Sequence, residues 1–243
     1  MTDDRKHHLA GLTRRALLQN AGIAGAAAAV GVIDVMVTPA LAEAPMEQAK
    51  TGLSEAEAYE HFTADEAELL EAIADQLIPS DDEGPGALEA RAVRYIDRAL
   101  GGALADSLDA YRSGLAAFDR YCRSSRDGSF MDLSDIDRTS ALIDIETGSV
   151  TGAVAGFVGS SSVFFEMVRS HVIQGTFSDP FYGGNANFVG WDLINYPGVR
   201  TAVTESDQRQ LEVDNLRSSR RSAYEWDQFN KAKVSTVRGR DAD

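Results

Sequence analysis

Apolar side chains recur at helical spacing over residues 104–122, and this pattern constrains the fold more than any other in the chain. Successive members lie four, three, four, three and four residues apart: Leu104, Leu108, Tyr111, Leu115, Phe118 and Cys122. Because an α-helix turns once in about 3.6 residues, these side chains fall on one face. The pattern predicts an amphipathic helix of about five turns that packs this face into a core, with Cys122 as a buried thiol.

Further segments share this spacing, and start and stop signals bound them. Thr63 and Glu66 form a capping box ahead of one helix, which Pro79 ends. No convincing alternation of apolar and polar residues indicates a strand. The sequence therefore predicts an all-α fold, one domain with about five or six main helices around one core. The segments that we expect to be helical are a short one at 55–61 and longer ones at 64–78, 88–100, 104–126, 134–146, 162–174 and 205–217.

Residues 1–42 carry the features of a cleavable twin-arginine signal peptide. Arg14 and Arg15 precede a weakly hydrophobic run, and Ala40 and Ala42 form a small-residue cleavage site. This order is typical of a secretory signal, and the arginine pair marks the twin-arginine kind. A transmembrane anchor is the alternative, but the run is short for a bilayer and contains a charged residue. We expect export to the periplasm as an already folded protein, with no membrane span in the mature chain.

Composition divides the rest of the chain into three parts. We expect a linker with the short helix over residues 43–61, the helical domain over 62–200, and a polar helix with an exposed tail over 201–243. The formal net charge is −15 at pH 7. Nucleic acids and anionic membrane surfaces require basic patches, so this charge argues against both and suits a basic protein partner.

Residues 175–198, which we call the aromatic segment, read GTFSDPFYGGNANFVGWDLINYPG. Glycine and proline interrupt helices and strands, so we predict a long ordered loop without a regular element. Its large aromatic side chains argue against disorder. Two interpretations remain open: the aromatic side chains form a binding surface, or they plug the protein's own core.

The sequence offers few groups for catalysis or metal binding. Beyond the signal it has two histidines, His61 and His171, and the single Cys122, whereas metal sites of nitrogen and sulfur ligands need three or four. No C-x-x-C-H haem motif occurs. The acidic turn at residues 81–83 could hold calcium, but its spacing is not that of an EF-hand, and a solvated turn is the simpler interpretation. We predict no catalytic residue and no metal or cofactor bound by this chain.

Two stretches carry a resemblance to a known family. The first, within residues 62–100, includes AIADQLIPSD at 72–81, PGA at 85–87 and YID at 95–97. The second is the aromatic segment, with GTF, DP, YGGN, GW and YPG in that order. Together they resemble the gluconate 2-dehydrogenase subunit 3 family, the small subunits of periplasmic sugar dehydrogenases, and the twin-arginine signal agrees. Asn195 departs from the pattern, because the family more often has glycine before Tyr-Pro-Gly.

The resemblance implies a non-catalytic subunit of a membrane-associated complex. In such complexes a large subunit of the glucose-methanol-choline oxidoreductase type binds FAD and oxidises a sugar, polyol or aldonate. A c-type cytochrome carrying haem c usually takes the electrons. Since the large subunit commonly lacks a signal, the small subunit would carry it, loaded with FAD, through the twin-arginine translocase.

The aromatic segment is the partner interface that we expect in this case. Interfaces are usually anchored by a few buried Trp, Tyr or Arg side chains, so Trp191 and Tyr182 are the expected anchors. Gly183 and Gly184 would let the backbone of the segment approach the partner closely. Pro180 and Pro197 would fix where the segment enters and leaves. The full set of predicted interface residues is Phe177, Asp179, Pro180, Tyr182, Gly183, Gly184, Asn185, Trp191, Tyr196, Pro197 and Gly198.

Two other functions remain open. One is a stand-alone periplasmic sugar-binding protein whose aromatic rings stack on a sugar, and it should be a stable monomer when expressed alone. The other is a cofactor-independent hydrolase or isomerase in which His171 works with a nearby carboxylate, and it should lose activity in His171→Ala. A packed, hydrogen-bonded His171 is the simpler interpretation of that residue.

Overall fold

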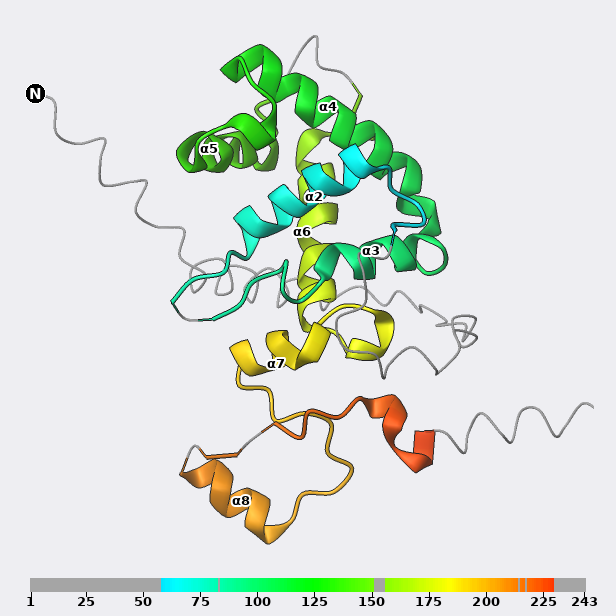
Figure 1. Cartoon of the computed structure of the whole chain (residues 1–243), viewed down its shortest axis with the longest axis vertical. Helices are drawn as coiled ribbons and strands as arrows, with labels where there is room; N and C mark the ends of the chain where they lie inside the picture. Colours follow the sequence, from blue (N-terminus) through cyan, green and yellow to red (C-terminus); the bar gives the residue numbers. More distant parts are fainter. Residues whose placement is uncertain (1–57, 83, 151–155, 214, 217, 230–243) are drawn as a thin grey trace, which may run out of the picture. The chain divides into compact units, whose positions relative to one another are not determined.

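Helix α6 (Ser161–Phe177) is the element on which most of the other helices pack (Figure 1). The computed structural model describes residues 58–82, 84–150, 156–213, 215–216 and 218–229, all of which belong to one unit. Within them the chain forms α-helices, short 3-10 turns and one isolated β-bridge, so the all-α prediction is confirmed. The helices that contact α6 are α2 (Ala64–Leu77), α3 (Ala92–Leu100), α4 (Leu108–Arg126), α5 (Asp135–Glu146) and α7 (Val189–Leu193). The predicted signal peptide lies outside the described residues.

The capping box predicted at the start of α2 is present. The Thr63 side chain accepts a hydrogen bond from the Glu66 N–H, and the Glu66 carboxylate accepts one from the Thr63 N–H. This exchange satisfies two backbone donors that a helix start leaves without intrahelical partners. The helix ends at Leu77, two residues before Pro79, with its apolar face buried.

Helix α3 begins later than the sequence pattern predicts. Residues 87–91 form turns instead, and Leu88, expected on the buried face, is 42% exposed. The Ala87 N–H donates to the Ile78 carbonyl at 2.8 Å, which ties this turn to the end of α2. A Cβ at Gly86 would overlap the same carbonyl, so only glycine fits there. Because this contact with the end of α2 holds residues 87–91 in a turn, the helix begins later. The spacing of apolar residues along the sequence gives no information on such a contact.

Helix α4 buries most of the periodic apolar face of residues 104–122. Tyr111, Leu115, Phe118 and Cys122 are buried as predicted, whereas a 3-10 turn over Ala105–Ser107 precedes the α-helix, so that it begins four residues later. Burial raises the pKa of the Cys122 thiol to about 12, so the thiol stays protonated and unreactive at neutral pH.

A buried carboxylate on α3 holds the chain that precedes α2. Asp97 is fully buried, and it accepts hydrogen bonds from the backbone N–H groups of Glu60, His61 and Phe62 at 2.8, 2.9 and 3.2 Å. The Arg94 guanidinium lies 3.6 Å away and balances the charge. Residues 58–61 are therefore not helical, which corrects the prediction of a helix at 55–61 over its described part. Residues 55–57 lie outside the described residues.

We expect Asp97→Asn to lower the free energy of unfolding by about 2 kcal/mol, because the amide loses acceptor capacity and turns an N–H₂ group toward backbone donors. Urea unfolding at pH 7 measures this change. Glu205→Gln is the matched control, since it removes only the exposed ion pair with Arg209 and should change stability by less than about 0.5 kcal/mol. Equal effects of the two substitutions would show that Asp97 does not hold this segment.

Candidate docking surface

The aromatic segment folds into short helical pieces. Helix α6 extends three residues into it, to Phe177, and α7 lies inside it. Two 3-10 turns, Pro180–Tyr182 and Ala186–Phe188, join these helices. Asp179 caps the first turn by accepting the Phe181 N–H at 2.9 Å. The prediction of a segment without regular elements is therefore wrong, because single turns fit between its glycines and prolines.

Asn185 organises the centre of the segment. It is fully buried, with a left-handed φ of 45°. Its side-chain oxygen accepts the Gly190 N–H at 2.8 Å, and its amide group donates to the Ser178 carbonyl at 2.8 Å. Its own backbone N–H donates to the Gly175 carbonyl at 2.8 Å. These three bonds hold the end of α6 and the start of α7 together.

Glycines allow the close approaches within this arrangement. A Cβ at Gly184 would overlap the Gly175 carbonyl, and a Cβ at Gly190 would overlap the Thr176 carbonyl. The close approach expected of Gly184 toward a partner is thus made to its own chain, and a further role in an interface stays a prediction. Asn195 is left-handed at φ 53°, a conformation that glycine and asparagine tolerate.

Trp191 is buried inside the chain. Its ring is 4% exposed, and its Nε1–H donates to the Phe177 carbonyl at 2.9 Å. The rings of Phe188 and Tyr196 pack on it, with centroids 5.2 and 4.9 Å away. Of the two interpretations of the aromatic segment, the core plug describes this side chain, and an anchoring role toward a partner stays a prediction.

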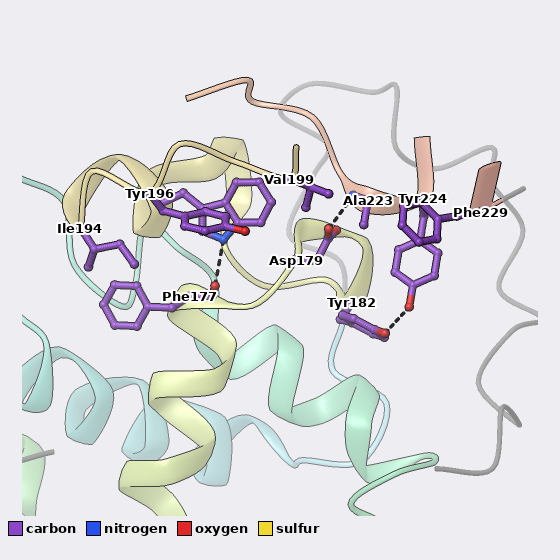
Figure 2. A pocket seen from close by; sticks show the side chains of 10 residues that line it. Phe177, Asp179, Tyr182, Ile194, Tyr196, Val199, Ala223, Tyr224 and Phe229 are labelled. Carbon is purple, nitrogen blue, oxygen red and sulfur yellow. Dashed lines mark hydrogen bonds between the residues drawn. The ribbon is translucent and has the colours of Figure 1, made fainter. Parts of the chain in front are cut away.

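Other side chains of the segment surround an open pocket of about 560 Å³ (Figure 2). Four large apolar side chains on it remain exposed: Tyr182 (38%), Ile194 (45%), Tyr196 (38%) and Phe229 (42%). The pocket is lined by Phe177, Asp179, Tyr182, Trp191, Ile194, Tyr196, Val199, Ala223, Tyr224 and Phe229. Five of the predicted interface residues thus meet at one surface, whereas Pro180, Gly183, Gly184, Asn185, Pro197 and Gly198 support it without lining the pocket.

The C-terminal part of the pocket comes from residues 218–229, which we call the C-terminal clasp. Its Ala223 N–H donates to the Asp179 carboxylate at 2.8 Å, and the Tyr224 and Tyr182 hydroxyl groups are hydrogen-bonded to each other (Figure 2). The prediction of an exposed tail holds only in part over the clasp: Ser222 is buried and Ala223 and Tyr224 are half-buried, whereas residues 227–229 are exposed. Residues 230–243 lie outside the described residues. Tyr224, Trp226 and Phe229 were the signal that could have revealed this packing, since three aromatic residues so close together are unusual in a solvated tail.

His171 is buried in the helical core. His171 faces the Tyr111 hydroxyl at 3.0 Å, and burial lowers the pKa of its imidazole. The packed interpretation of His171 is thus confirmed, and the hydrogen-bond partner of its Nδ1 is the Tyr111 hydroxyl. Within the part of the chain that the structure describes, no group of three or more His, Cys, Asp or Glu residues could hold a metal ion. Glu83 of the acidic turn lies outside that part.

None of the described helices is both long enough and apolar enough to cross a membrane. Burial and the hydrogen bond to Tyr224 raise the pKa of the Tyr182 hydroxyl above its usual range, so it remains a neutral hydrogen-bonding group at this surface. The surface can therefore offer apolar area and polar hydroxyl groups to a binding partner.

Comparison with known proteins identifies one family. A family model described as gluconate 2-dehydrogenase subunit 3 matches residues 64–198, which is more than half of the chain. The match runs from the start of α2 to the end of the aromatic segment. No curated protein and no solved structure matches the chain.

Proposed function

The chain belongs to the gluconate 2-dehydrogenase subunit 3 family, and we propose that it is the non-catalytic small subunit of a periplasmic, FAD-dependent dehydrogenase for a sugar, polyol or aldonate. The observation that carries this proposal is the extent of the family match, which includes both the helical core and the aromatic segment. A family named for a subunit implies partner subunits in a gluconate 2-dehydrogenase-like complex.

The aromatic segment is the surface through which we propose that the large subunit binds. Stable interfaces bury exposed apolar and aromatic side chains, and Tyr182, Ile194 and Tyr196 present such groups around one pocket. Trp191 supports them from beneath. The large subunit would be of the glucose-methanol-choline type and would hold the FAD. A c-type cytochrome with haem c would receive the electrons and associate the complex with the membrane.

The second role that we propose is export. The arginine pair, Arg14 and Arg15, would direct this chain to the twin-arginine translocase, with the folded and FAD-loaded large subunit bound to it. FAD has to be inserted before translocation, which is a physical reason for using a route that carries folded cargo. In this proposal both cofactors belong to partner subunits.

We expect Ile194→Asp to weaken binding of the large subunit by at least about tenfold, because it places a charge without a partner in the apolar part of the interface. Ile194 is 45% exposed in the isolated chain, so the substitution should hardly change the free energy of unfolding of this chain. Titration of the purified variant with the FAD-loaded large subunit measures the affinity, and a thermal melt verifies the fold.

The matched control is Ile136→Asp, which makes the same change on α5 at a side chain that is 71% exposed and does not line the pocket. This variant should bind like the parent chain. If Ile194→Asp also binds like the parent, the aromatic segment is not the docking surface.

A stand-alone sugar-binding protein is the second candidate, and the aromatic lining of the pocket favours it, since its volume of about 560 Å³ lies within the range of ligand sites. Titration calorimetry with gluconate and glucose separates the candidates. If a sugar binds the isolated chain saturably, and Tyr196→Ala abolishes this binding, the chain is a sugar-binding protein. The subunit proposal predicts no heat of binding for either sugar.

A further inference from the structure

The C-terminal clasp lies on the part of the molecule that we propose as the docking surface. The Ser219 N–H donates to the Pro197 carbonyl at 3.1 Å, and Arg220 pairs with Asp192 of α7. The Tyr224 ring stacks on Phe181, with ring centroids 4.0 Å apart. The clasp therefore contacts the aromatic segment in its first and in its last third.

The Asp179 carboxylate accepts two hydrogen bonds from the clasp and so links the clasp to the aromatic segment. One carboxylate oxygen, Oδ1, accepts the Ser222 hydroxyl at 2.6 Å as well as the Phe181 N–H. The other oxygen, Oδ2, accepts the Ala223 N–H at 2.8 Å. Ser222 is 5% exposed and Asp179 is half-buried, so these bonds are partly shielded from water, and hydrogen bonds to a charged acceptor are stronger than neutral ones. Asp179 thus caps a turn of the segment and binds the clasp at the same time.

The family match ends at Gly198, so the surface that the clasp covers lies inside the matched region and the clasp lies outside it. An interface shared by such subunits would be built from the matched region. The clasp therefore covers part of a surface of that kind. Its stacked Tyr224 shields Phe181 and part of Tyr182, whose exposure would enlarge an apolar patch, whereas Ile194 and Tyr196 stay 45% and 38% exposed.

We propose that the C-terminal clasp is an intramolecular cover over residues 179–182 of the docking surface, held by Asp179, which is closed in the free chain and opens when the large subunit binds. This inference rests on the proposed function. Only molecules with an open clasp can bind the partner. The apparent affinity is therefore the intrinsic affinity multiplied by the fraction of open molecules. It also keeps aromatic rings covered while the subunit is alone.

Hydrogen exchange of the isolated chain tests the fastening without any partner. Asp179→Asn keeps the Oδ1 acceptor that caps the turn and removes the Oδ2 acceptor of the Ala223 N–H. Ser222→Ala removes the clasp hydroxyl that donates to Asp179 Oδ1, and leaves the bond from the Ala223 N–H. In both variants, peptides from residues 218–229 should exchange faster by about tenfold or more, while peptides from α4 and α6 keep the parent's rates.

The control for this measurement is Asp192→Asn, which removes only the solvent-exposed pair with Arg220 and should change exchange by less than about twofold. Unchanged exchange of the clasp in both Asp179→Asn and Ser222→Ala would overturn the assigned fastening.

Affinity for the FAD-loaded large subunit tests the cover, with variants on the clasp alone. Ser222→Ala and Tyr224→Ala should bind the large subunit more tightly, by a factor similar to the increase in clasp opening. Equal or weaker binding, despite faster exchange, would overturn the cover, and weaker binding would make the clasp a part of the interface. If the parent and both variants all fail to bind the large subunit, the proposed function fails, whereas the exchange result on Asp179 still stands.

Discussion

Replacing Trp191 by alanine is expected to lower the free energy of unfolding of the isolated chain by about 3–5 kcal/mol. The indole is 4% exposed, packs between Phe188 and Tyr196, and donates to the Phe177 carbonyl. Alanine would leave a large cavity beneath the pocket and an unpaired carbonyl at the end of α6. A chain of this size is stable by only about 5–15 kcal/mol, so the loss should be evident as a much lower melting temperature.

Phe229→Ala is the matched control, since it also removes an aromatic ring that lines the pocket, but from a side chain that is 42% exposed. Its effect on stability should stay below about 1 kcal/mol. Urea unfolding followed by circular dichroism compares the two variants. An unchanged midpoint for Trp191→Ala, with affinity for the large subunit lowered about 30-fold or more, would contradict the buried role and restore Trp191 as an interface anchor.

The helical core follows largely from local sequence signals. The capping residues Thr63 and Ser134 begin α2 and α5 as predicted, and the periodic apolar face of α4 is buried from Tyr111 to Cys122. These signals act within one or two turns of a helix, so a single sequence reveals them. The start of α3 could not be predicted in this way, because a contact between Ala87 and Ile78 sets it.

From the sequence alone the aromatic segment can be either a binding surface or a core plug, because its internal structure depends on non-local contacts. Gly184 and Gly190 approach carbonyl groups of α6, and Asn185 bonds to three other residues of the segment. Composition shows that such residues can turn the chain, but it does not show what they approach. The same holds for the clasp, whose position depends on Asp179, more than 40 residues away from Ala223.

The second large effect that we expect is on the amount of protein exported to the periplasm. We expect Arg14→Lys with Arg15→Lys to retain this chain in the cytoplasm, because the arginine pair is the feature that the twin-arginine translocase reads. The large subunit should be retained with it, fully folded and loaded with FAD. Ile194→Asp with the arginine pair intact separates the two roles, since this chain should then reach the periplasm while less of the large subunit accompanies it.

Cells that produce both proteins can be fractionated, and the large subunit measured in each compartment, to test the claim that this chain binds the flavoprotein and carries it across the membrane. With the parent chain, the flavoprotein and its FAD should be found in the periplasmic and membrane fractions. With Arg14→Lys and Arg15→Lys, nearly all of the flavoprotein should remain in the cytoplasm, still binding this chain. A flavoprotein that reaches the periplasm equally well with either form of the chain would contradict the claim.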